Sequence, residues 1–125
     1  MIARFIIPGR LSGTNDIIRM AAYNRFAGGA RRKQEKTACA IQIERQNKQR
    51  IEFKNPVLVS FSWIEPNNKR DLDNITGGQK VIFDALVMLG ILQNDTREWV
   101  RGISHSFPTP DKEKPRIEIE IRETF

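Results

Sequence analysis

Hydrophobic and polar positions alternate most regularly near the end of the chain. In residues 115–122, Ile117, Ile119 and Ile121 alternate with charged residues, which predicts a strand with one buried face. Other stretches rich in β-branched and aromatic residues also predict strands. These further strands are expected over residues 2–7, closed by Pro8-Gly9, over residues 51–63, where Asn55-Pro56 makes the strand long or broken, and over residues 98–107.

Apolar residues at helical spacing predict three helices between these strands. The third is the clearest, because its apolar residues recur on one face until Gly90 supplies a C-terminal stop. The helices are expected over residues 16–25, with N-cap chemistry in Ser12-Gly13-Thr14-Asn15 and an end at Gly28-Gly29, over about residues 30–46, with Ala38, Ala40 and Ile41 facing inward, and from the DLDN stretch at 71–74 to Gly90.

The order strand, helix, helix, strand, helix, strand, strand predicts a mixed α/β (α+β) fold with a small mixed sheet and helices packed on it. The chain has 125 residues, which suits a single domain over residues 1–125, because two separate cores of half that size would bury little apolar surface. The order in which the strands pair does not follow from the pattern.

The composition indicates the class of protein and the cellular compartment to expect. Hydrophobic residues make up 39% of the chain, and no apolar run is long enough to cross a bilayer. The N-terminal MIARFIIPGR lacks the small-residue cleavage site of a signal peptide. Cys39 and His105 are the only residues of their types, so the usual ligands form neither an intrachain disulfide nor a structural zinc site. We therefore expect a reducing, cytoplasmic setting.

Positive charge is concentrated in the first part of the chain. Residues 1–54 carry 12 basic and 4 acidic residues, a net +8, whereas residues 55–125 carry 9 and 11, a net −2. This asymmetry indicates either a polyanionic partner such as nucleic acid or merely a solvated basic surface. The densest cluster lies near the start of the second predicted helix, where cations oppose the helix dipole, so phosphate binding explains them better than folding does. The cluster comprises Arg31, Arg32, Lys33 and Lys36.

Two carboxylates introduce candidate chemistry. Asp71 and Asp73 lie two residues apart, so in an extended loop both project to the same side and can share one cation. Mg²⁺ suits such a site, because it prefers oxygen ligands and keeps waters, one of which can attack a phosphodiester. Lys69 and Arg70 are then candidates for holding the flanking phosphates. The alternative is structural: Asp73 caps the following helix and Asp71 is an ordinary loop residue.

The residues after DLDN extend this pattern. Lys80 precedes FDAL, and Asp95 follows in ILQND. In order and spacing, residues 67–100 resemble the RusA family of Holliday junction resolvases, and the start, IIPGRLSGTND, is similar to the family's first strand, Pro-containing turn and Asn. Some members place the lysine one turn after DxDN, whereas residues 75–79 intervene here, and some have two adjacent acids where this chain has Asn94-Asp95.

The resemblance implies a homodimer that binds branched DNA, namely four-way junctions, and nicks paired strands with Mg²⁺ or Mn²⁺. It implies aspartates that are catalytic and bind the metal at the positions of Asp71, Asp73 and Asp95, and a catalytic lysine at that of Lys80. Short resolvases of this type often accompany prophages. Two other functions remain open: a DNA-binding module without catalysis, and a metal-dependent nuclease that acts mainly on flaps or replication forks.

Helix length bears on how the three aspartates meet. An unbroken helix from Asp73 to Gly90 is about 26 Å long, and the five residues on to Asp95 return at most roughly 17 Å. Either Asp95 joins the other two aspartates of a second subunit, or Gly77-Gly78 delays the helix and the loop folds back along it. Two glycines in a first turn also suggest a close backbone contact.

A few other residues have simpler explanations. Trp63 and Trp99 could stack on unpaired bases, but aromatic residues on strands are more often part of the core. His105 is expected to be a sheet residue and Cys39 a small core residue. Asn15 could contact the site or cap a helix.

Overall fold

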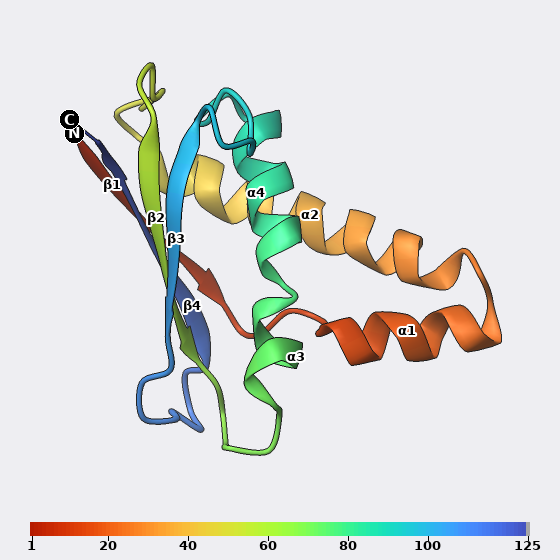
Figure 1. Cartoon of the computed structure of the whole chain (residues 1–125). Coiled ribbons are helices and arrows are strands. Elements are labelled where there is room, and N and C mark those ends of the chain that lie inside the picture. Colours follow the sequence, from red (N-terminus) through yellow and green to blue (C-terminus); the bar gives the residue numbers. More distant parts are fainter. Residues whose placement is uncertain (125) are drawn as a thin grey trace.

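The chain forms four strands, β1 (Ile2–Pro8), β2 (Val57–Ile64), β3 (Val100–Ser106) and β4 (Arg116–Glu123). In the computed structural model, which describes residues 1–124, these strands make one sheet in the order β1-β4-β2-β3 (Figure 1). β4 is antiparallel to both its neighbours, and β2 is parallel to β3. The predicted mixed sheet is therefore confirmed.

The alternation predicted for the last strand is present. Ile117, Ile119 and Ile121 are buried and lie opposite the buried residues of β1, whereas the charged residues between them are on the other face. The buried residues of β1 are Ala3, Phe5 and Ile7. β1 and β4 thus each give one face to the core and the other to the opposite side of the sheet.

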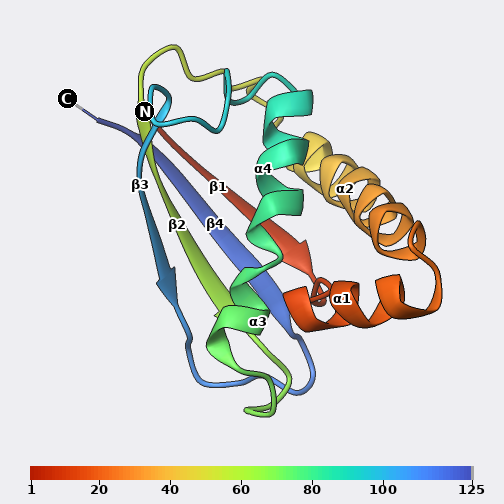
Figure 2. The ribbon, with the colours of Figure 1, turned by 45° about the vertical axis from the view of Figure 1, so that its right-hand side comes forward.

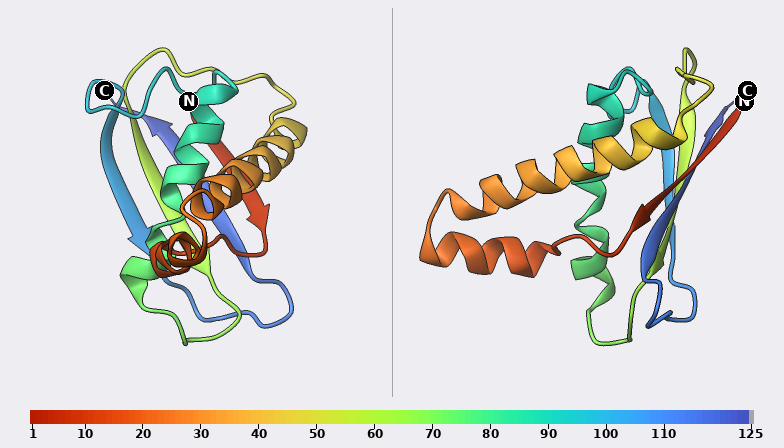
Figure 3. Two further views of the ribbon diagram at one scale, coloured as in Figure 1. Left: turned by 90° about the vertical axis from the view of Figure 1, so that its right-hand side faces the viewer. Right: turned by 180° about the vertical axis from the view of Figure 1, so that it is seen from behind.

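Four helices complete the fold: α1 (Thr14–Tyr23), α2 (Ala27–Gln46), α3 (Leu72–Thr76) and α4 (Gln79–Met88). All four lie on the same side of the sheet, and α4 runs along it (Figures 1 and 2). α1 and α2 form a hairpin that projects away from the sheet (Figure 3). The predicted fold class, a mixed α/β fold with helices packed on a small sheet, is confirmed.

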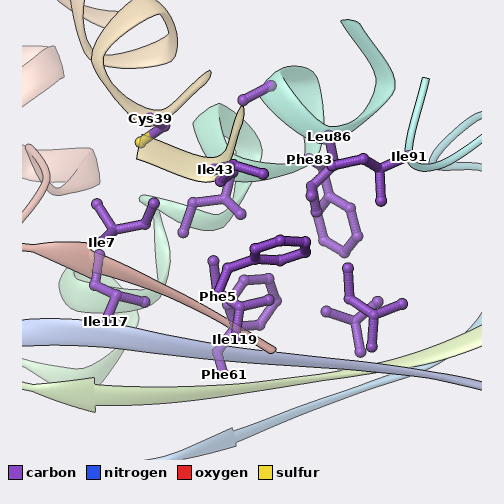
Figure 4. Packing of buried hydrophobic residues seen from close by; sticks show 14 of the residues in the cluster. Phe5, Ile7, Cys39, Ile43, Phe61, Phe83, Leu86, Ile91, Ile117 and Ile119 are labelled. Carbon is purple, nitrogen blue, oxygen red and sulfur yellow. The ribbon is translucent and has the colours of Figure 1, made fainter. Parts of the chain in front are cut away.

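The core lies between the sheet and the helices α2 and α4. Phe61 of β2 lies at its centre, with its ring 5.6 Å from that of Phe83 in an edge-to-face arrangement. Cys39 and Ile43 of α2 are buried on the helix side of this core (Figure 4). The prediction that Cys39 is a small core residue is confirmed, because 1% of it is exposed.

The hairpin differs from the prediction in two ways. Gly28-Gly29 does not end the first helix: α1 ends at Tyr23, and both glycines lie in the first turn of α2. A Cβ on Gly28 would lie 3.0 Å from Ile17 Cγ2, so this glycine allows α1 and α2 to pack closely.

The inward face of α2 also differs. Ala40 is buried as expected, but Ala38 is exposed and Ile41 is 48% exposed. Cys39 and Ile43 take the inward positions instead, four residues apart on one face. The predicted inward placement of Ala38 and Ile41 was therefore wrong.

The expected long helix is divided. It ends as α3 at Thr76 and resumes as α4 at Gln79, with Gly77-Gly78 between. Gly90 is the predicted stop: it has φ +77°, and the N–H of Ile91 bonds to the carbonyl of Leu86 at 3.0 Å. Residues 51–56 are not part of a strand, so β2 begins only after Asn55-Pro56.

None of the helices within residues 1–124 combines the length and apolarity needed to span a membrane.

Candidate functional site

The loop between β2 and α3 is held by a buried ion pair. Arg70 Nε and Nη2 each donate to a carboxylate oxygen of Glu65 at 2.8 Å, and Arg70 Nη1 donates to the carbonyl of Leu11 at 3.0 Å. The side chains of Arg70 and Glu65 are 12% and 9% exposed. This pair fixes the residue that precedes Asp71, so the acidic motif begins from a rigid point.

The same pair removes Arg70 from the predicted phosphate-binding set. Its guanidinium is engaged by Glu65, Leu11 and, at 3.7 Å, Asp16, which leaves little of it for a ligand. The neighbouring Lys69 is exposed and remains a candidate. Arg70 is engaged because Glu65, five residues earlier, is buried and its carboxylate requires a cationic partner.

Asp71 and Asp73 lie at the start of α3 and are both exposed. Asp71 occupies the N-cap position, yet its carboxylate makes no capping hydrogen bond. Asp73 lies inside the first turn, so the structural interpretation of Asp73 as the cap is wrong; its Oδ1 accepts only the N–H of Asn74, at 3.0 Å. Helix capping therefore does not explain why this motif has two acids.

Asn74, the last residue of DLDN, joins α3 to α1. It is 8% exposed, and its Oδ1 accepts the backbone N–H of Asn15 at 2.9 Å. There is no room for a side chain on either side of this contact: a Cβ on Gly13 would lie 2.6 Å from Asn74 O, and one on Gly77 would lie 2.9 Å from Thr14 N. Both suggestions for Gly77-Gly78, a late start of α4 and a close backbone contact, are confirmed.

The sequence gives no indication that Asn74 joins two helices, because its partner Asn15 lies 59 residues earlier. The position of Asn74 directly after the acidic pair in DLDN was the available signal of a role at the site. Asn15 takes part through its backbone, and its side chain is exposed.

Lys80, Asp84 and Asp95 form a second charged cluster. Lys80 Nζ lies 3.0 Å from Asp84 Oδ1 and 3.6 Å from Asp95 Oδ2. The hydrogen bond and the charge of Asp84, followed by those of Asp95, raise the pKa of Lys80 above its ordinary value. Lys80 is therefore a protonated donor beside Asp95, and Asp84 forms an i,i+4 ion pair with it on the surface of α4.

Asp95 reaches this position because the loop after α4 folds back. The backbone N–H of Phe53 bonds to the carbonyl of Ile91 at 2.9 Å, and Ile91 and Leu92 are both buried. The loop thus starts from an anchored point and returns along α4. The expected fold-back of this loop is present, because Asp95 contacts the side chain of Lys80, the second residue of α4.

Within one protomer the two groups of acids remain separate. Among residues 1–124 no three Asp, Glu, His or Cys side chains gather closely enough to hold a metal ion. α3 precedes the N-terminal end of α4, whereas the chain leaves α4 at its C-terminal end (Figure 1), and Asp95 returns only as far as the side chain of Lys80. Asp71 and Asp73 nevertheless fit a hard divalent cation, since both offer exposed oxygens and neither forms an ion pair with any described residue.

The basic cluster of α2 lies beside the break between α3 and α4. Arg32 Nη1 donates to the carbonyl of Gly77 at 3.4 Å. Arg31 and Lys33 are exposed, and Lys36 is half-buried. Arg32 therefore brings one cation of this cluster to the C-terminal end of the helix that carries the acidic motif, where it could also bind a phosphate.

The aromatic and histidine side chains of the sheet have structural roles. Trp63 is 2% exposed, and its Nε1–H donates to His105 Nδ1 at 2.9 Å, so Trp63 is a core residue as predicted. His105 lies on β3, which confirms its placement in the sheet. Burial lowers the pKa of His105.

Comparison with known proteins identifies the family. No curated protein matches this chain in sequence. The profile of the family described as Endodeoxyribonuclease RusA matches residues 15–122, which include both carboxylate groups and the basic start of α2. The match covers most of the 125 residues. The chain therefore belongs to the RusA family of endodeoxyribonucleases.

Proposed function

We propose that this protein is a divalent-metal-dependent, structure-selective endonuclease that resolves Holliday junctions in DNA recombination and repair. Family membership supports the endonuclease activity. The observation that carries the rest is the pair of exposed carboxylates, Asp71 and Asp73, which form no ion pair with any residue among 1–124. Asp73 lies about one helical turn before Gly77, whose carbonyl accepts a hydrogen bond from Arg32 of the cationic helix α2. Carboxylates placed beside DNA repel it unless a cation lies between them and the phosphate.

Asp71 and Asp73 are the proposed ligands of that cation, with Mg²⁺ as the expected ion and Mn²⁺ as a substitute. A divalent ion held there supplies Lewis-acid stabilisation of the phosphate and lowers the pKa of a water molecule. The protein's part is to keep both carboxylates on one rigid helical turn. Arg70-Glu65 and Asn74-Asn15 fix that turn from both sides.

Lys80 and Asp95 complete the proposed catalytic group within the same protomer. The ammonium of Lys80 can donate to a phosphate oxygen as negative charge develops there, and Asp95 orients it. Lys80 lies seven residues after Asp73, about 10 Å along a helix axis, and a lysine side chain spans much of that distance. We also propose Asp95 as a third metal ligand, as the family resemblance implies; this requires Asp95 to approach Asp71 and Asp73 from its position beside Lys80.

The DNA contacts proposed outside the reacting phosphate are those of Arg31, Arg32, Lys33, Lys36 and Lys69. Cations along one helix can follow the phosphates of one DNA arm without reading its sequence. Symmetric cutting of a junction needs two active sites, so we propose a homodimer that presents one site from each protomer.

The test uses labelled four-way junctions, flaps, forks and linear duplex at equal salt, with Mg²⁺, with Mn²⁺ or with EDTA. The wild-type protein should nick the four-way junction on paired strands in Mg²⁺, and Asp73→Asn should lower the rate about 100-fold or more while still binding the junction. Binding without nicking by the wild type would identify a DNA-binding module. Faster nicking of flaps or forks would identify a different nuclease.

A further inference from the structure

The hairpin of α1 and α2 ends in two exposed aromatic rings. Tyr23, the last residue of α1, is 90% exposed, and Phe26, immediately before α2, is 68% exposed. These rings contrast with Trp63, which is buried in the core, and Trp99, which is half-buried. Two large rings exposed together at the end of a projecting hairpin (Figure 3) contribute little to the core, so they mark a candidate contact surface.

The tip is ordered without being packed. Asn24 Oδ1 accepts the backbone N–H of Phe26 at 2.9 Å, and the N–H of Ala27 bonds to the carbonyl of Asn24 at 2.9 Å. The guanidinium carbon of Arg25 lies 4.7 Å from the centre of the Phe26 ring. Behind the tip, Gly28 keeps the two helices in contact. The rings are thus presented on a stiff support.

Charge indicates what kind of partner fits. Residues 17–34, the distal part of the hairpin, contain five basic residues and no acidic one. A surface with basic residues and no acidic ones attracts phosphates and offers no carboxylate to a basic partner. Exposed rings among unopposed arginines are what proteins use to stack on unpaired bases while holding the adjoining backbone. The basic residues are Arg19, Arg25, Arg31, Arg32 and Lys33.

The tip of the hairpin lies on the same helix, α2, as a residue that contacts the proposed catalytic region. Arg32, which contacts the carbonyl of Gly77, lies six residues after Phe26, about 9 Å along the axis of α2. A DNA strand held by Arg32 near the acidic motif would therefore continue toward the rings. Four-way junctions offer splayed or strained bases at the branch point, whereas continuous duplex offers none.

We propose that the tip is a second DNA contact, at which Tyr23 and Phe26 stack on bases exposed at the branch point and Arg19 and Arg25 hold the flanking phosphates. This inference rests on the proposed function, since it assumes branched DNA as substrate. It adds a basis for distinguishing branched DNA from duplex, which the cations of α2 do not supply by themselves.

The test is binding in EDTA, where no cleavage occurs, to four-way junctions with 2-aminopurine at the branch point. Stacking contributes about 1–3 kcal/mol per base, so Tyr23→Ala/Phe26→Ala should weaken junction binding about 10-fold or more and abolish the fluorescence change. The affinity of this double variant for duplex DNA should differ from that of the wild type by less than about two-fold. Tyr23→Phe/Phe26→Tyr keeps both rings and should bind as the wild type does.

Ile41→Ala is the matched control, because Ile41 is a 48% exposed apolar residue of the same hairpin, away from the tip. Light scattering on every variant should give an unchanged mass. Three results would overturn the proposal: wild-type junction affinity in the alanine variant, an equal loss for duplex and junction, or a change in oligomeric state, which would make the tip a contact between copies. Because this assay measures binding without metal, its failure leaves the nicking assay of the proposed function unaffected.

Discussion

Two adjacent cations, Lys69 and Arg70, show how burial decides the role of a residue. Arg70 is tied to the buried Glu65, whereas Lys69 is exposed. Sequence alone could not separate them, because the partner of Arg70 is defined by the buried position of Glu65 rather than by any motif. The same limit applied to Asn74, whose partner Asn15 is 59 residues distant.

Arg70→Ala should lower the free energy of unfolding by about 3 kcal/mol, because it leaves the carboxylate of Glu65 buried without its main cation. Arg10, with Nη2 3.6 Å from Glu65, compensates only in part. Urea denaturation measures the change. Lys69→Ala is the matched control, with a change within about 0.5 kcal/mol but a shallower salt dependence of DNA binding. Equal stability of the two variants would show that the buried pair is unimportant.

His105 should make stability depend on pH. It accepts a hydrogen bond from Trp63, and burial lowers its pKa below the ordinary value of 6.5, so the folded protein resists a proton that the unfolded chain accepts. The free energy of unfolding should therefore fall as the pH drops below about 6.5. Urea denaturation at pH 7.5 and 5.5 tests this. His105→Asn keeps an acceptor but does not titrate, and should show a smaller decrease; an equal decrease would exclude His105 as the cause.

At the scale of elements, the glycines at the start of α2 and α4 were recognised as special but assigned differently from one another. Gly77-Gly78 was linked to a late helix start or a close contact, and both are present. The sequence predicts a helix end at Gly28-Gly29, since glycine is a good stop signal in the absence of tertiary information. It lies inside a helix because Gly28 packs against Ile17, a contact that no local pattern reveals.

Gly77→Ala should destabilise the protein by about 1–3 kcal/mol, because its Cβ would lie 2.9 Å from the backbone nitrogen of Thr14 and force α1 away from α3. It should also lower nicking, since α3 carries Asp71 and Asp73. Gly29→Ala is the control: nothing lies within 4 Å of its Cβ, and alanine favours a helix by about 0.5–1 kcal/mol. Thermal denaturation compares them, and a destabilised Gly29→Ala with an unaffected Gly77→Ala would contradict the contact.

At the scale of the whole molecule, the element order and the buried faces of the strands were predictable because they depend on local periodicity. The sheet order β1-β4-β2-β3 was not, since it depends on which strands meet across long connections. Asp71 and Asp73 could be selected from their spacing and Asp95 from the family resemblance. Their separation into two groups depends on the break after α3 and the fold-back of the loop after α4.

Dimers of mixed protomers test whether one chain supplies the whole site. A purified heterodimer of wild-type and Asp71→Asn/Asp95→Asn protomers should keep one intact site and make single nicks. A heterodimer of Asp71→Asn and Asp95→Asn protomers should be inactive, because each site then has one lesion. The opposite pattern would show that Asp95 completes the partner's site.

The most direct measurement of the central claim, that these aspartates hold a divalent cation, is a crystal structure with Mn²⁺ and its anomalous difference map. The account predicts a peak within about 2.2 Å of carboxylate oxygens of Asp71 and Asp73, which disappears in Asp73→Asn. A map in which Mn²⁺ binds elsewhere, or persists unchanged in Asp73→Asn, would contradict it.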